Sequence, residues 1–340
     1  MNLLNDKIES IACLIEKCLS ESGDDALPLD IKELADKLIN ESQIYNQWFV
    51  PDHVRYSLSL AVEECRFLNE RLSNLPNIRD QANVDETDDH ALCLYRPSAP
   101  LEGVLEMLLF ALKYKQCVLH VAEGQKTILE TFIKIIETIP GLRNKLIISE
   151  KPVTNPRNVF VIGKINQTMK DYLSKYKFKQ NHEEGTSVLI SRDPDPQQLS
   201  ALANQVCMFF GRSRNSCKVL YVHEDFNLKV LQPYFDEYKE QLFHNKYFNN
   251  YEYRKSVMII NNIPYEEIGP LLVTESQLQA GYVSVLCIQR YKKEEDIADN
   301  YLSGRFKMVT KSKKSELEWG KHTLSYFCRN YEETAGDTCF

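Results

Sequence analysis

The chain has 340 residues, of which 43% are hydrophobic and 26% are charged, and its formal net charge is −7. The length favours two domains, and the acidic balance argues against a general binder of nucleic acid or of anionic membranes. No run of about 18 apolar residues occurs, so no membrane span is expected. The N-terminal segment, interrupted by Asp6, Lys7 and Glu9, lacks the apolar core of a signal peptide.

Ten cysteines are spread along the chain. No pair has the spacing of a metal site apart from Cys13 and Cys18, which lie in an apolar helical pattern. This distribution predicts free thiols in a reducing cytoplasm and no metal centre.

The first 89 residues are predicted to form a helical lead-in. Apolar residues recur at helical spacing at Ile8, Ile11, Ile15 and Leu19, and similar patterns cover residues 34–39 and 54–72. The segment 76–89 is polar and acidic, which is typical of a loop or linker.

Residues 90–190 alternate short apolar strands with amphipathic helices. Strands are predicted at 92–95, 117–121, 146–148, 159–162 and 187–190, and helices at 101–113, 126–139 and 168–176. This alternation predicts a parallel, doubly wound sheet of the Rossmann-like, cofactor-binding type. Ligands of such sheets bind beyond the carboxyl ends of the strands, where RPSAP (96–100), AEGQK (122–126) and GKINQ (163–167) lie.

Residues 191–315 repeat the pattern and predict a second α/β domain. Helices are expected at 197–210, 228–240 and around 294–302, and strands at 219–222, 257–260 and 283–288. The tail, 316–340, is expected to return to the first domain or to a partner subunit.

Three loops of the first domain hold candidate binding residues. Ser98 follows a strand and precedes a helix, where a hydroxyl can meet an anion or a developing oxyanion. His120 suits a phosphate and Glu123 suits ribose hydroxyls, whereas Gly163 permits close approach of a cofactor or a helix. The alternative interpretations are a proline-rich connection at Ser98, a solvated strand end at His120 and Glu123, and an ordinary turn at Gly163. The chain has no GxGxxG and no Walker A motif.

The second domain offers one candidate nucleophile. Cys217 lies beside Lys218 and near Arg212 and Arg214, and neighbouring cations favour a thiolate. The alternative is a half-buried structural thiol. The Asn- and Tyr-rich stretch 244–256 suits the lining of a cleft or an intersubunit contact.

The runs FFGRSRNSCKVLYV (209–222) and HNKYFNNYEYRKS (244–256) resemble the bacterial acyl-CoA reductase family, relatives of the fatty acyl-CoA reductases of bioluminescence operons. The resemblance covers about residues 90–340. It implies an aldehyde dehydrogenase-like α/β fold of two doubly wound domains, and reduction of an acyl-CoA or other acyl thioester to an aldehyde with NADP or NAD. In this family a cysteine thiolate takes the acyl group, and a backbone N–H with an asparagine holds the oxyanion.

Four positions depart from the family pattern. The nucleophile aligns with Arg214 or Ser213, and Cys217 lies a few residues further on. The oxyanion asparagine aligns with Ser98, and the lysine that meets the cofactor ribose aligns with His120, although Glu123 is kept. The small hydroxyl residue after Gly163 is replaced by Lys164.

Two hypotheses therefore stay open. The chain is an NAD(P)H-dependent acyl-thioester reductase with Cys217 as a relocated nucleophile, or it is a non-catalytic relative that acts as a binding or scaffold partner. A homodimer or an acyl-transfer partner protein suits either hypothesis.

Overall fold

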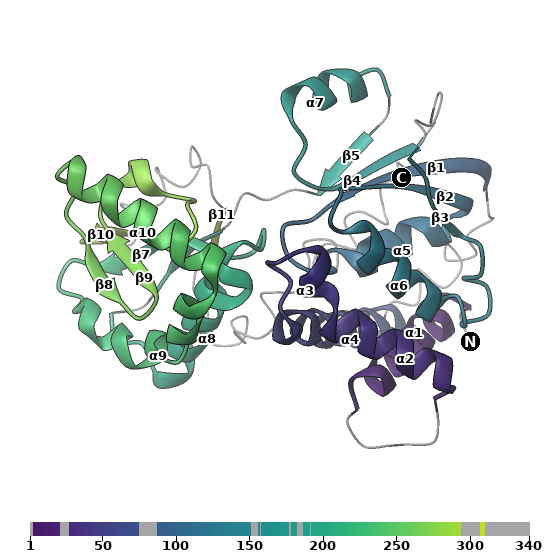
Figure 1. The fold of residues 1–340 in the computed structure, drawn as a ribbon, viewed down its shortest axis with the longest axis horizontal. Helices are drawn as coiled ribbons and strands as arrows, with labels where there is room; N and C mark the ends of the chain where they lie inside the picture. The colour runs from purple at the N-terminus through teal and green to yellow at the C-terminus, as the bar shows by residue number, and fades with distance from the viewer. Residues whose placement is uncertain are drawn as a thin grey trace. The chain divides into compact units, whose positions relative to one another are not determined.

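The computed structural model describes residues 3–20, 27–74, 87–150, 156, 158–176, 178–181, 186–190, 192–293 and 307–309. The chain forms two compact units, with the boundary between residues 182 and 183 (Figure 1). The helix expected around 294–302 and the tail 316–340 lie outside the described residues.

The first unit begins with helices. Their bounds are Leu3–Leu19 (α1), Leu29–Asn40 (α2), Ser42–Tyr45 (α3) and Pro51–Asn74 (α4). The apolar residues expected to share one face of the first helix are indeed buried, because Ile8, Ile11 and Ile15 are at most 2% exposed. The helical period of the sequence thus defines the face that packs into the core.

A five-stranded parallel sheet forms the centre of this unit. Its strands are Thr87–Arg96 (β1), Tyr114–Val121 (β2), Leu146–Ile148 (β3), Asn158–Gly163 (β4) and Phe178–Asn181 (β5), in the order β3-β2-β1-β4-β5. Strand β5 was not expected from the sequence. The helices between them are Val104–Leu112 (α5), Lys126–Ile136 (α6) and Gln167–Leu173 (α7).

The two faces of this sheet are covered differently. Helices α1, α2, α4, α5 and α6 lie on one face and α7 lies on the other (Figure 1). Along β1, Cys93 and Tyr95 contribute to the thick helical layer, whereas Leu92 and Leu94 belong to the cluster beneath α7. Burial on both faces explains why β1 is apolar at successive positions.

The second unit contains a six-stranded sheet in the order β11-β6-β7-β10-β9-β8. The strands are Thr186–Leu189 (β6), Cys217–His223 (β7), Glu266–Ile268 (β8), Leu271–Thr274 (β9), Val285–Tyr291 (β10) and Lys307–Val309 (β11). Only β8 runs antiparallel to its neighbour in this described sheet. Helices Pro196–Cys207 (α8) and Gln232–Asp236 (α9) pack on one face, and Asn245–Ile260 (α10) packs on the other. Short 3₁₀ turns span Met208–Gly211, Leu228–Leu231, Lys239–Phe243 and Gln277–Gln279.

The expected strand at 257–260 is wrong, because these residues form the last turn of α10. This helix begins after His244, whose Nδ1 accepts a hydrogen bond from the Tyr247 backbone N at 3.3 Å. The helix buries Tyr247, Tyr251 and Met258, which recur at helical spacing. A short apolar run cannot by itself distinguish a strand from the end of a helix.

Two further expectations need correction. The predicted helix 228–240 is broken into two 3₁₀ turns and the short helix α9, with Pro233 near the start of α9. The strand expected at 187–190 in the first domain is β6, and it pairs with β7 and β11 in the second sheet. Pairing between distant segments, rather than chain order, places this strand.

Candidate functional site

The carboxyl end of β1 lies against the end of β4. Arg96 and Gly163 are partners in the parallel register, and Gly163 has φ +88°. A Cβ at Gly163 would lie 2.0 Å from the Arg96 carbonyl oxygen, closer than any side chain tolerates. This glycine is therefore required by strand-to-strand packing, and the close approach predicted for a cofactor or a helix is made by the chain's own backbone.

The loops after β1 and β2 are tied together. Gln125 is buried, and its Nε2 donates a hydrogen bond to the Pro97 carbonyl. Ser98 is half-buried in the first loop, whereas Glu123 in the second loop and Lys164 after β4 are exposed. The structure thus places Ser98, Glu123 and Lys164 in the loops that follow β1, β2 and β4, and Gly163 at the end of β4 itself.

A cavity of about 470 Å³ lies beneath α7. Leu92 and Leu94 of β1 and Met169 and Leu173 of α7 contribute apolar walls, and His120 at the end of β2 also lines it. The remaining lining residues, from the start of α7 and its exposed side, are Asn166, Thr168 and Tyr172. An apolar cavity with a few polar groups at the carboxyl ends of parallel strands is the usual form of a small-molecule site in such folds.

His120 is in contact with Arg96. The Arg96 Nη2 lies 3.5 Å from the His120 Nδ1, at the outer limit of a hydrogen bond. Burial, and then the nearby Arg96 guanidinium, lower the pKa of His120, so the imidazole is neutral at pH 7. Because a guanidinium can only donate, Nδ1 accepts in this contact and the ring proton is on Nε2.

The loop before β7 is the other candidate region. Phe209, Phe210 and Gly211 have φ values of 57°, 57° and 64°, so three successive residues adopt the left-handed conformation. For the two phenylalanines this costs about 2–4 kcal/mol together. Aromatic packing offsets it, because the Phe210 ring lies 4.6 Å from the His244 ring and 5.5 Å from the Tyr247 ring.

Cys217 faces the protein core. Its side chain belongs to the cluster that contains Leu220 and Val222, and the residue is 2% exposed. Its Sγ donates to the Val219 carbonyl at 3.4 Å. A register shift opposite Thr186 and Ser187 makes an irregularity of the bulge type here, which places Cys217 on the same face as Leu220.

Burial decides the charge state of this thiol. It raises the pKa of Cys217 to about 12, although the neighbouring Lys218 lowers it. The same burial lowers the pKa of Lys218 to about 8, and the Lys218 Nζ donates to the Gly211 carbonyl. The predicted activation by neighbouring cations is thus outweighed by desolvation, and the thiol is protonated at pH 7.

Ser213 and Arg214, the positions aligned with the family nucleophile, are both buried, at 9% and 7% exposure. The Ser213 Oγ accepts a hydrogen bond from the Asn215 backbone N at 3.1 Å, and its carbonyl accepts from the Ser216 N at 3.0 Å. These contacts shape a turn. A guanidinium is always charged and has no lone pair for nucleophilic attack.

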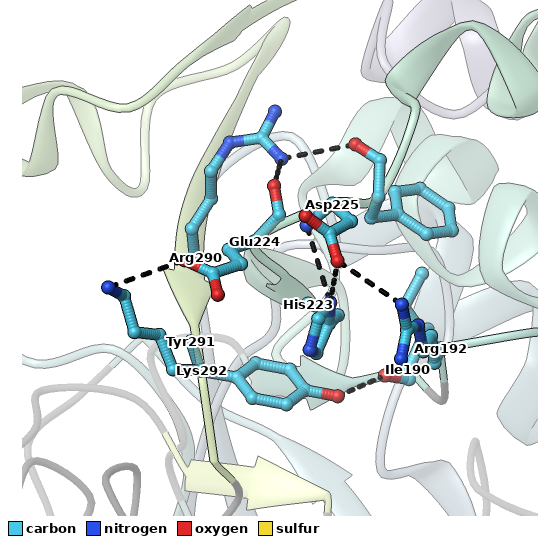
Figure 2. A network of polar contacts seen from close by, with 9 residues as sticks. Ile190, Arg192, His223, Glu224, Asp225, Arg290, Tyr291 and Lys292 are labelled. Atoms are coloured by element: carbon cyan, nitrogen blue, oxygen red, sulfur yellow. Dashed lines mark hydrogen bonds and ion pairs between the residues drawn. The ribbon is translucent and has the colours of Figure 1, made fainter.

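The carboxyl ends of the second sheet carry a network that the sequence did not reveal (Figure 2). The Arg290 Nη1 donates to the carbonyls of Glu224 at 2.9 Å and Phe226 at 3.1 Å, and its Nε donates to Glu275 at 2.8 Å. Nearby, the Arg192 Nη2 contacts the Asp225 carboxylate at 3.2 Å. These arginines are matched by acceptors of the chain itself, so the network stabilises the loop after β7.

The sequence also missed Arg96 and the cavity. A cation directly after the apolar run of β1 was the available signal for Arg96. The cavity depends on α7, whose first residues carry the polar lining groups. No local sequence pattern predicts this cavity. No group of metal-ligating side chains occurs among the residues that the structure describes. In the same residues, no helix is long and apolar enough to cross a membrane.

Comparison with known proteins identifies the fold. No family model and no curated protein sequence matches this chain. Succinate-semialdehyde dehydrogenase from Burkholderia pseudomallei is 11% identical, with a TM-score of 0.60 over 94% of this chain and 76% of that one. Aldehyde dehydrogenase 21 from Physcomitrella patens, in complex with the reaction product succinate, is 13% identical, with a TM-score of 0.57 over 86% and 70%. HpcC from Thermus thermophilus is 13% identical, with a TM-score of 0.55 over 86% and 66%. The predicted aldehyde dehydrogenase-like α/β fold is therefore confirmed.

Proposed function

We propose that this chain is a non-catalytic relative of the aldehyde dehydrogenases that binds a nicotinamide dinucleotide in its first unit and forms no thioester on Cys217. The observation that carries the proposal is the burial of Cys217, with its Sγ bonded to a strand carbonyl and its pKa raised to about 12. Thioester formation needs a thiolate that the substrate can reach.

The first unit supports the binding half of the proposal. A dinucleotide held at the carboxyl edge of the sheet would meet His120, with Glu123 available for ribose hydroxyls and the cavity beneath α7 available for the flat face of a heteroaromatic ring. The buried Arg96 Nε, which has no hydrogen-bond partner among the described residues, fits an anionic ligand. Such a cofactor supplies a hydride when it takes part in a reaction.

The alternative, an acyl-CoA reductase, makes different demands. It needs a nucleophile, and neither the hydroxyl of Ser213 nor the guanidinium of Arg214 supports that role in the observed turn. The proposed role is therefore that of a nucleotide-responsive binding or scaffold protein, as the four replaced family positions suggest.

The decisive experiment combines a binding test with a chemical test on the full chain. NADPH and NADH are titrated by calorimetry, and we expect saturable binding of at least one. At hundredfold excess over Kd, the bound nucleotide should raise the free energy of unfolding by about 2.7 kcal/mol. In parallel, the protein is incubated with octanoyl-CoA and NADPH, and we expect no mass adduct and no loss of NADPH absorbance.

Cys217→Ala is the matched variant. Acylation or NADPH consumption that disappears in this variant would establish the reductase and overturn the non-catalytic reading. Absence of binding by both nucleotides would overturn the binding half alone.

A further inference from the structure

The outer face of helix α10 is apolar. Phe248, Tyr253, Ile259 and Ile260 are between 44% and 78% exposed, whereas Met258 of the same helix is buried against the second sheet. The solvent side of a surface helix ordinarily carries charged and polar residues, because large apolar side chains gain free energy when they leave water. Four large apolar side chains exposed on one helix therefore indicate a contact surface.

The order of residues along this face is self-complementary. Phe248, Glu252, Lys255 and Ile259 are separated by four, three and four residues, so they form one stripe along α10. The stripe is about 16 Å long at the rise of an α-helix. It has an apolar residue at each end and opposite charges in the middle. When two such stripes lie antiparallel, each Phe248 lies opposite the partner's Ile259, and each Glu252 lies opposite the partner's Lys255.

Both charged residues of the stripe are available for such a pairing. Glu252 is exposed and forms no ion pair with a residue that the structure describes. The Lys255 Nζ lies 2.8 Å from the Glu267 carboxylate, and an ammonium group has two further N–H donors. A parallel pair of helices would instead place Glu252 beside Glu252 and Lys255 beside Lys255. The charges of the stripe therefore favour the antiparallel arrangement.

The surface extends beyond the stripe. The Cζ of Arg254 lies 5.0 Å from the centre of the Tyr253 ring and 3.3 Å from that of the Tyr282 ring, in the turn before β10. Phe243, one residue before the N-cap of α10, is also exposed. Aromatic residues and arginine are enriched at protein interfaces. These flanking side chains widen the surface toward the area of about 800 Å² that each partner of a stable complex buries.

We propose that α10 is the contact helix of a homodimer, in which two copies of the chain pack α10 against α10 in antiparallel orientation. The twofold axis lies midway between residues 253 and 254. Because both copies use the same patch, the contact closes on itself and gives a dimer rather than a filament. The interface lies on the second unit and contains none of the residues proposed to bind a nucleotide, so it is independent of the proposed function.

Sedimentation velocity of the full chain tests for the dimer. We expect a reversible monomer–dimer equilibrium with a Kd on the order of 1–10 μM, followed from about 0.1 to about 100 μM protein. Ile259→Asp should raise this Kd at least about a hundredfold, because it places a carboxylate against Phe248 at two symmetric positions. Ile44→Asp is the matched control. It changes an exposed isoleucine of α3 in the first unit and should leave the Kd unchanged.

Two charge reversals test the register of the helices. Glu252→Lys places lysines opposite lysines, and Lys255→Glu places glutamates opposite glutamates, so each variant alone should dimerise at least about tenfold more weakly. An equimolar mixture of the two should form a mixed dimer with a Kd near that of the reference, because every new lysine then lies opposite a new glutamate. The reference and both variants carry Glu267→Gln, which removes the carboxylate beside residue 255. Native mass spectrometry counts the three kinds of dimer.

The expected result is a dimer that is lost in Ile259→Asp and recovered in the mixture of charge variants. A chain that stays monomeric at about 100 μM overturns the proposal, as does a dimer that Ile259→Asp leaves unchanged. Absence of the mixed dimer overturns the antiparallel register.

In a chain that stays monomeric, protection of Glu252 from carbodiimide labelling would assign the face to another segment of the same chain. Full labelling would leave it for a different protein. Thermal unfolding shows whether each variant keeps its fold. Ile259→Asp should bind nucleotides as the wild type does, so the failure of this proposal and that of the proposed function are measured separately.

Discussion

The two units of this chain treat their reactive and charged side chains in opposite ways. In the first, Arg96 and His120 lie at the edge of a sheet beside a cavity, and among the described residues the guanidinium has no ion pair and its buried Nε has no hydrogen-bond partner. In the second, Cys217 is enclosed by the core and Arg290 is bonded to three acceptors. A reactive or charged side chain can thus bind a ligand only where the fold leaves its polar atoms without hydrogen-bond partners.

The largest effect expected from this contrast is on the rate at which the Cys217 thiol is alkylated. With a pKa of about 12, its thiolate fraction at pH 8 is about 1,000-fold below that of a thiol at the ordinary value of 9.0, so alkylation should slow by at least that factor. Peptide mapping after timed exposure to iodoacetamide measures this rate in the native protein. Cys13, which is exposed on α1, serves as the internal control and should react first. Equal labelling of the two thiols would contradict the enclosed site.

The next largest effect is on the stability of the first unit and concerns Gly163. It tests whether this glycine is required by strand packing or by ligand access. Gly163→Ala should lower the free energy of unfolding by about 3–5 kcal/mol, because the new Cβ meets the Arg96 carbonyl and φ is positive. Gly124→Ala is the matched control: its φ is +77° but the nearest atom is 3.3 Å away, so about 1–2 kcal/mol is expected. Urea unfolding measures both, and equal losses would show that strand contact is not the reason for this glycine.

A buried lysine of the second unit gives a pH-dependent test. Lys218→Met should raise the free energy of unfolding at pH 7 by about 1–3 kcal/mol, because it removes a desolvated charge. In the folded wild type the pKa of Lys218 is lowered to about 8, whereas the unfolded chain keeps the proton up to about 10.5. Between these values the unfolded state binds more protons, so wild-type stability rises with pH and the advantage of the variant shrinks.

Urea unfolding at pH 7, 8, 9 and 10 measures the difference in free energy of unfolding between Lys218→Met and the wild type. Lys229→Met, a change at an exposed position, should give a difference that does not vary with pH in the same way. A gap for Lys218→Met that stays constant from pH 7 to 10 would show that Lys218 is not desolvated.

The smallest effects belong to the network of the second sheet edge. Arg290→Ala should destabilise the protein by about 1–2 kcal/mol, because two backbone carbonyls lose their donor. Arg192→Ala should change stability by less than about 0.5 kcal/mol, because both members of its ion pair are 66% exposed. Thermal unfolding of the two variants measures both effects. A larger loss of stability in Arg192→Ala than in Arg290→Ala would contradict this prediction.

Much of the fold was accessible from the sequence because strands and helices leave periodic apolar patterns. Strand β3 and the start of α6 were predicted at the observed residues. Strands β4 and β7 were predicted over their central residues, and β1 and β2 only over their C-terminal halves. The apolar end of α10 was misassigned, since its period emerges only when the whole helix from Asn245 is considered. Strand β6 was found but placed in the wrong sheet, because a strand carries no local record of its partners.

The sequence by itself determined the fold class and the carboxyl-edge loops of the first sheet, and the resemblance it carries predicts Ser213 or Arg214 at the position of the nucleophile. Only the tertiary structure decided that Cys217 is a core thiol, that Gly163 is required by close packing against the backbone of β1, and that the buried Nε of Arg96 has no hydrogen-bond partner among the described residues. The physical reason is that local periodicity fixes an element, whereas desolvation and partner choice are set by segments far away in the chain. Charge near a thiol in sequence says little about its pKa until burial is known.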